Sequence, residues 1–132
     1  MAPTTGADVI ARRLAAAGVR HAFGIPGGEV LALVDALERA GISFHLAKHE
    51  NAAGFMAEGV WHATGAPAVL VATVGPGLAN AFNVVANAEQ DRVPLIGISG
   101  MSDPAEQLTY THQVFDHAAV FARVTKASLR AP

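Results

Sequence analysis

The apolar run APAVLVATV at residues 66–74 carries no charged side chain, and it constrains the fold more than any other stretch. A strand in the centre of a parallel sheet is buried on both faces, so its sequence is continuously apolar rather than alternating. Shorter apolar runs at 21–25, 43–47 and 94–100 alternate with segments of helical periodicity. This alternation predicts one α/β domain, a doubly wound parallel sheet flanked by helices.

Helical spacing and end signals place the expected helices between these strands. Thr4 or Thr5 can cap the first helix, Gly18 ends it, and Gly65 ends the third helix. Helices are expected at 29–40, 50–63, 78–90 and 114–122, and a last strand at 123–129. The apolar residues at helical spacing, which we expect to face the core, are Val9, Ile10, Leu14 and Ala17, then Val30, Leu33, Val34 and Leu37, then Ala53, Met56, Ala57 and Val60.

The composition excludes several classes of function. The formal net charge of −2 provides no basic surface for nucleic acid or an anionic membrane. No apolar run approaches the roughly 20 residues of a membrane helix. With no cysteine in the chain, there is no disulfide and no thiolate zinc site, and such a composition suits the cytoplasm. None of the six histidines forms an H-x-x-x-H pair with a helical carboxylate between, and His45 and His49 span a strand end rather than one helix face, so we predict no metal site within this chain.

Three unusual turns follow the first three predicted strands: FGIPGG, KHEN and VGPGLAN. Ligands of open parallel sheets bind beyond the carboxyl ends of the strands, where the strand order reverses. Glycine and proline at strand ends are also ordinary turn residues, so neither glycine turn is specific alone. The segment GIPGGE does not match G-x-G-x-x-G, and no G-x-x-x-x-G-K-S/T loop occurs, which argues against a dinucleotide or P-loop site.

Glu50 lies between an apolar strand and an apolar helix. One interpretation is structural, because a carboxylate in the first turn of a helix is stabilised by the helix dipole. The other is functional, since a carboxylate in an apolar surrounding is suited to sharing a proton. Asn80 has a plain interpretation as an early residue of a helix, and His112 and Gln113 as hydrogen-bonding residues of a loop.

Four ordered blocks of the chain carry a resemblance to a known family: VRHAFGIPGGEVLALVDAL, KHENAAGFMAEG, ATVGPGLANAFNVVANAEQDRVPLIGISG and THQVFDHAAVFARVTKAS. Together they resemble the N-terminal pyrimidine-binding (PYR) domain of thiamine-diphosphate-dependent enzymes of the acetolactate synthase and 2-oxoacid decarboxylase type. The resemblance covers nearly the whole chain. It implies the cofactor-activating half of a lyase or carboligase that acts on small 2-oxo acids.

The resemblance also implies roles for particular residues. Glu50 would hydrogen-bond N1′ of the aminopyrimidine and so favour removal of the thiazolium C2 proton. Gln113 would face the reacting C2 side, and His112 beside it would assist proton transfer or bind the substrate carboxylate. The residues expected near the aminopyrimidine are Ile25, Pro26, Pro76 and Asn80. Ile25, Val74 and Val114 differ from residues common in acetolactate synthases, which leaves lyase and carboligase both open.

Partners are implied in the same way. The family holds Mg²⁺ and the diphosphate on a separate domain, through a Gly-Asp-Gly segment that this chain lacks. We therefore expect residues 1–132 to be a PYR domain without its last helix or the central and C-terminal domains, facing the diphosphate-binding (PP) domain of another subunit or chain in a homodimer or tetramer. FAD is possible but not indicated. The alternatives are a non-catalytic assembly or regulatory module, or the small subunit of a split decarboxylase.

Overall fold

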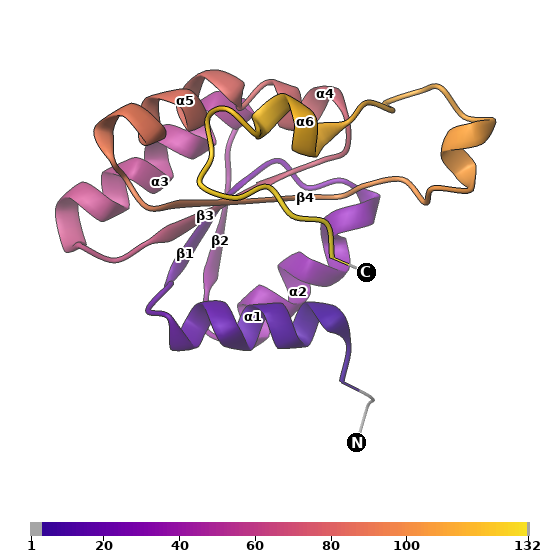
Figure 1. Ribbon diagram of the computed structural model, residues 1–132. Coiled ribbons are helices and arrows are strands. Elements are labelled where there is room, and N and C mark those ends of the chain that lie inside the picture. Colours follow the sequence, from indigo (N-terminus) through magenta and orange to yellow (C-terminus); the bar gives the residue numbers. More distant parts are fainter. Residues whose placement is uncertain (1–3, 132) are drawn as a thin grey trace.

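The computed structural model describes residues 4–131 and shows a four-stranded parallel sheet with helices on both faces (Figure 1). The strands are β1 (His21–Gly24), β2 (Ser43–Leu46), β3 (Ala68–Ala72) and β4 (Leu95–Ser99), in the order β2-β1-β3-β4. Helices α1 (Gly6–Ala16) and α2 (Leu31–Arg39) cover one face, and α3 (Glu50–Thr64) and α5 (Phe82–Asp91) cover the other. The predicted α/β class is confirmed.

Strand β3 explains why the run at 66–74 is apolar throughout. Every residue of β3 is buried, and the side chains alternate between two cores. Val69 and Val71 pack with α1 and α2, whereas Leu70 packs with α3 and α5. Neighbouring β1 approaches so closely that a Cβ on Gly24 would overlap the carbonyl of Val71. The centre of the sheet is therefore dry on both faces.

Helix α1 begins with a capping box that the sequence predicted in part. Thr5 Oγ1 accepts from the backbone N–H of Asp8 at 3.2 Å, and the Thr5 N–H donates to Asp8 Oδ2 at 2.8 Å. These bonds and the Arg39 guanidinium lower the pKa of Asp8 to about 2. The buried stripe is centred on Ala11 and Leu14.

Two helices turn a different face to the core than we predicted. In α1 the buried stripe lies beside Val9, which is 46% exposed, and Ala17 is exposed as well. In α3 the stripe passes through Ala53 and Ala57, and Met56 on the next face is 46% exposed. Single apolar residues outside the stripe are compatible with helical spacing, so the pattern alone did not separate the two faces. The stripe predicted for α2 is confirmed by Leu33 and Leu37.

The remaining differences concern element boundaries. The helix predicted at 78–90 is two helices, α4 (Pro76–Ala79) and α5, and a 3₁₀ turn, η1 (Gly28–Val30), precedes α2. The expected helix at 114–122 is the shorter α6 (His117–Phe121), and a second 3₁₀ turn, η2 (Glu106–Leu108), lies in the preceding loop.

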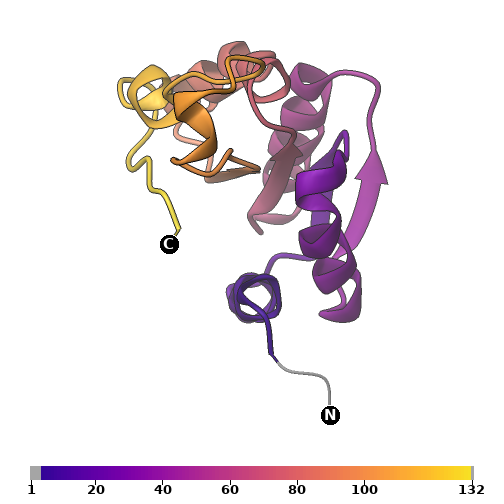
Figure 2. The same ribbon diagram turned by 90° about the vertical axis from the view of Figure 1, so that its right-hand side faces the viewer.

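The prediction of a strand at 123–129 is wrong. The N–H of Val124 and the hydroxyl of Thr125 both bond the carbonyl of Phe121, at 3.0 Å and 2.8 Å. These local bonds continue the turn after α6 instead of a sheet ladder, and Figure 2 shows this segment descending beside the sheet. Within residues 4–131, none of the helices has the length and apolar character needed to span a bilayer.

Candidate functional site

The sheet reverses its order between β1 and β3. The chain passes from β1 to β2 on one side, and α3 then carries it back to β3 on the other side (Figure 1). The turns that follow β1 and β3 therefore leave adjacent strands at the same edge, and a parallel sheet of this kind places its ligands there. Ile25 and Pro26, both half-buried, begin the first turn. Gly75 and the exposed Pro76 form the second.

Glu50 is the buried carboxylate at this edge. It is the first residue of α3 and is 6% exposed. Asn80 Nδ2, just after α4, donates to Glu50 Oε2 at 3.0 Å. Glu50 Oε1 has no hydrogen-bond partner among the described residues. Every fully buried polar side-chain atom of these residues has such a partner, so Oε1 is not fully buried. Oε1 is therefore an oxygen that solvent or a ligand can reach.

Gly77 packs tightly against Thr73 beside that oxygen. A Cβ at this position would overlap Thr73 Oγ1 and would lie 3.4 Å from Glu50 Oε1. A side chain here would thus clash with Thr73 and come into van der Waals contact with the carboxylate. The site combines a fixed carboxylate with a glycine backbone beside it, and glycine permits such a close approach of the backbone.

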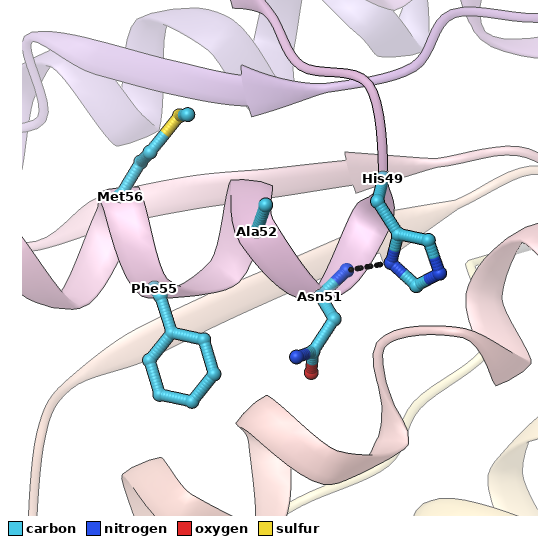
Figure 3. A pocket seen from close by; sticks show the side chains of 5 residues that line it. All are labelled: His49, Asn51, Ala52, Phe55 and Met56. Atoms are coloured by element: carbon cyan, nitrogen blue, oxygen red, sulfur yellow. Dashed lines mark hydrogen bonds between the residues drawn. The ribbon is translucent and has the colours of Figure 1, made fainter.

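The start of α3 is held by its neighbours in the chain and in space. His49 is the N-cap, and its Nδ1 accepts from the Asn51 N–H at 3.1 Å (Figure 3). Asn51 Oδ1 accepts from the Val84 N–H of α5 at 2.9 Å. Glu50 is thereby fixed by a cap on one side and by a helix contact on the other. Lys48 is exposed, in agreement with a solvated charge.

The glycine turn brings in a segment from far along the chain. Gly75 has φ +68°, and a Cβ there would lie 2.5 Å from the carbonyl oxygen of Gln113 and 2.7 Å from its Cα. Gln113 itself has φ +62°. The structure therefore places Gln113 against the turn, next to the helix that leads to Asn80. His112 is exposed. Its ring packs edge-on against the Tyr110 ring, with 6.3 Å between the ring centroids.

Two side chains at this edge were missed by the sequence analysis. Glu29 Oε1 accepts from the Val74 N–H at 2.7 Å, and a Cβ on Gly100 would overlap Glu29 Cγ. Glu29 thus connects the turns after β1, β3 and β4. His117 Nε2 accepts from the Gly75 N–H at 3.0 Å. Both contacts join residues more than 40 positions apart, so no local pattern could have indicated them.

A second buried carboxylate lies in the same helix. Glu58 is 5% exposed, and Asn87 Nδ2 donates to its Oε2 at 3.1 Å and to its Oε1 at 3.3 Å. The pair resembles Glu50 with Asn80, but both oxygens of Glu58 are engaged, and Glu58 lies about two helical turns along α3 from Glu50. Glu58 is therefore a structural counterpart of Glu50 and a matched control for it.

The comparisons with known proteins agree with this geometry. A family model described as the N-terminal TPP binding domain of thiamine pyrophosphate enzymes matches residues 4–120. The chain belongs to this family. Thiamine pyrophosphate is the same compound as thiamine diphosphate, so the resemblance inferred from the four sequence blocks is confirmed.

Curated relatives of this TPP-binding domain are acetolactate synthases. The chain is 39% identical to the acetolactate synthase of Bacillus subtilis over 124 residues, 94% of this chain and 22% of that protein. It is 44% identical to the isozyme 3 large subunit of Escherichia coli over 97 residues, 73% of this chain and 17% of that one. It is 37% identical to the catabolic acetolactate synthase of Raoultella terrigena over 121 residues, 92% of this chain and 22% of that protein. The chain spans about a fifth of the length of these relatives.

The outer side of α3 is hollowed and partly apolar. A shallow pocket there is lined by His49, Asn51, Ala52, Phe55 and Met56 (Figure 3). Phe55 and Met56 leave the helix in opposite directions, and they are 42% and 46% exposed. No group of three or more histidine, aspartate or glutamate side chains within residues 4–131 is arranged to hold a metal ion.

Proposed function

We propose that this TPP-binding domain is the cofactor-activating half of a thiamine-diphosphate-dependent lyase or carboligase, acetolactate synthase-like, that acts on 2-oxo acids. The observation that carries the proposal is the Glu50 carboxylate, buried, held at Oε2 by Asn80 and open at Oε1 beside Gly77. A carboxylate fixed in this way can share a proton with a ring nitrogen in a surrounding with little water.

The residues present fit the aminopyrimidine of thiamine diphosphate. When bound, the cofactor supplies a carbon nucleophile and an electron-accepting ring for cleavage next to a ketone. Glu50 Oε1 would hold the proton shared with N1′ of the pyrimidine. Asn80 keeps the carboxylate in place, and the backbone of Gly77 lies beside it.

The turn residues complete this half of the site. Ile25 and Pro26 would contact one side of the pyrimidine, and Pro76 would contact it from the glycine turn. Gln113, which lies against Gly75, would face the reacting side of the cofactor. His112 is exposed in the same loop, from where it would transfer protons or bind the substrate carboxylate.

The diphosphate and Mg²⁺ need residues that this chain lacks. We propose that they bind to the PP domain of another subunit or chain, so that the active unit is at least a dimer. The exposed Phe55 and Met56 on α3 support such a partner, since apolar side chains in a shallow pocket are commonly covered by protein. Their position next to His49, at the start of the helix that carries Glu50, supports a partner that would lie beside the cofactor.

The test compares Glu50→Gln with Glu58→Gln in the complete protein. Glu50→Gln should lower thiamine-diphosphate-dependent release of CO₂ from a panel of 2-oxo acids by about 100-fold or more, because the proton is no longer shared. Glu58→Gln changes an equally buried carboxylate of the same helix and should leave turnover within about threefold of wild type. Wild-type activity of Glu50→Gln would refute the proposal. Absence of any cofactor-dependent activity in the wild type would favour the non-catalytic assembly module.

A further inference from the structure

His117 is a buried histidine that the proposed chemistry does not use. It is the first residue of α6 and is 8% exposed. Its Nε2 lies 3.0 Å from the Gly75 nitrogen, and its Nδ1 lies 3.5 Å from Ser99 Oγ. A backbone N–H can only donate, so Nε2 must be the unprotonated acceptor and the ring proton must sit on Nδ1. The ring is therefore held neutral in one tautomer.

Gly75 belongs to a hydrogen-bonded unit that reaches the site. The Leu78 N–H bonds the Thr73 carbonyl at 3.1 Å, and the Ala79 N–H bonds the Gly75 carbonyl at 3.1 Å. The Asn80 N–H bonds the Pro76 carbonyl at 3.0 Å, and the Asn80 side chain then bonds Glu50. These bonds connect the backbone of Asn80 to the backbone of the glycine turn.

We infer that His117 is a positioning residue: as a neutral ring it holds the glycine turn, and through it Asn80 and Glu50, and on protonation it releases the turn. This inference deepens the proposed function and rests on it for its consequence in catalysis. The link between His117, Gly75 and Asn80 is a property of the chain itself. It can therefore be measured whether or not the protein turns over a substrate.

The surroundings of the ring set the direction of the switch. Burial lowers the pKa of His117, and the neighbouring Asp116 carboxylate partly opposes this. The ring contacts two uncharged groups from other parts of the chain, the Gly75 N–H and the Ser99 hydroxyl, and the nearby Phe115 ring at 4.5 Å between centroids. Once protonated, the ring would turn a second N–H toward the Gly75 N–H. The bond is thus complete above the ordinary histidine pKa of about 6.5 and is lost as the pH falls below it.

Helix α6 has a second attachment that does not depend on His117. The Phe121 ring lies 5.5 Å from that of Phe82 on α5, and Phe121 is 6% exposed. The Asp116 carboxylate caps the helix by accepting from the Ala119 N–H at 2.9 Å. A change of the imidazole should therefore leave α6 docked, so that its effect on the turn can be read separately from unfolding.

Two isosteric substitutions separate the two ring nitrogens. In His117→Gln the amide oxygen can replace Nε2 as acceptor, at the same number of bonds from the backbone, but it does not titrate. In His117→Asn the amide nitrogen can replace Nδ1–H as the donor toward Ser99, but the shorter side chain has no acceptor that reaches Gly75. The first variant should keep the turn in place at every pH, and the second should loosen it at every pH.

The experiment is an NMR titration of the full chain from pH 8 to pH 5. In wild type, the His117 ring should show the Nδ1–H tautomer, and the Gly75 amide and the Asn80 side-chain amide should shift with the midpoint of His117, below about 6.5. In His117→Gln the chemical shifts of both amides should not change over this pH range. In His117→Asn the Gly75 amide should exchange with solvent roughly threefold to tenfold faster than in wild type. An Nε2–H tautomer, or an Asn80 amide that ignores His117 while Gly75 follows it, would overturn the inference.

A second readout connects the switch to activity in the complete protein. In wild type, cofactor-dependent turnover should fall as the pH is lowered through the range in which His117 titrates. In His117→Gln this fall in turnover at acidic pH should be absent. If wild type is active and His117→Gln keeps the same fall in turnover at acidic pH, the inference fails while the proposed function stands. If wild type shows no cofactor-dependent turnover, the proposed function fails and the NMR titration alone decides whether His117 holds the turn.

Discussion

Gly54 in α3 allows the sharpest prediction about packing. A Cβ at this position would overlap Val84 Cγ1 and would lie 2.9 Å from Cγ2 and 3.1 Å from Cβ of the same residue. Val84 is fully buried in α5, so it has little room to move. Gly54→Ala should therefore cost about 1–3 kcal/mol through overpacking, of which about 1 kcal/mol is offset by the higher helix propensity of alanine.

Gly59 is a matched control in the same helix. A Cβ there meets nothing within 4 Å, so Gly59→Ala gains the propensity without the clash and should stabilise the chain by up to about 1 kcal/mol. Propensity and unfolded-state entropy are common to both substitutions. The difference between the two variants, about 1–3 kcal/mol, therefore isolates the contact between α3 and α5.

Urea unfolding followed by circular dichroism gives both free energies of unfolding. Adding Val84→Ala to Gly54→Ala should restore part of the loss, because the smaller side chain leaves space for the new methyl group. If Gly54→Ala and Gly59→Ala change the stability equally, the close contact between the two helices does not exist and the reasoning is refuted.

Three further results are expected from the turns and caps. Thr5→Ala removes the cap of α1 and should lower the free energy of unfolding by about 1 kcal/mol in urea. Because the pKa of Asp8 is lowered to about 2, the stability it contributes is present above about pH 4 and is lost as the pH falls toward 2; Asp8→Asn should flatten the unfolding free energy over that range. Glu29→Ala leaves the Val74 N–H without its acceptor and should cost about 1 kcal/mol, whereas Glu29→Gln, which keeps an acceptor oxygen, should recover most of it.

The sequence was informative wherever a local pattern carries the physics. The run at 66–74 predicted a strand buried on both faces because apolar residues appear on both sides of it. The residues of the turns and Glu50 predicted a candidate site at one edge of the sheet, and the structure brings these residues together there. The contacts that position the site were not predictable, because Glu29 with Val74 and His117 with Gly75 are paired by the topology. The exposure of Met56 was not predictable either, because helical spacing alone does not show which apolar residues of α3 lie outside its buried face.

Packing and chemistry are joined in this domain through the pair of helices α3 and α5. The same side of α3 carries Glu50 and Gly54, and Asn51 between them accepts from the Val84 N–H. The Asn80 amide, which holds the Glu50 carboxylate at 3.0 Å, stands just before α5. A methyl group at Gly54 would push α3 and α5 apart. This would lengthen the hydrogen bond from Val84 to Asn51 first and the hydrogen bond from Asn80 to Glu50 next. The absence of a side chain at Gly54 therefore serves the carboxylate one turn away as much as it serves the core.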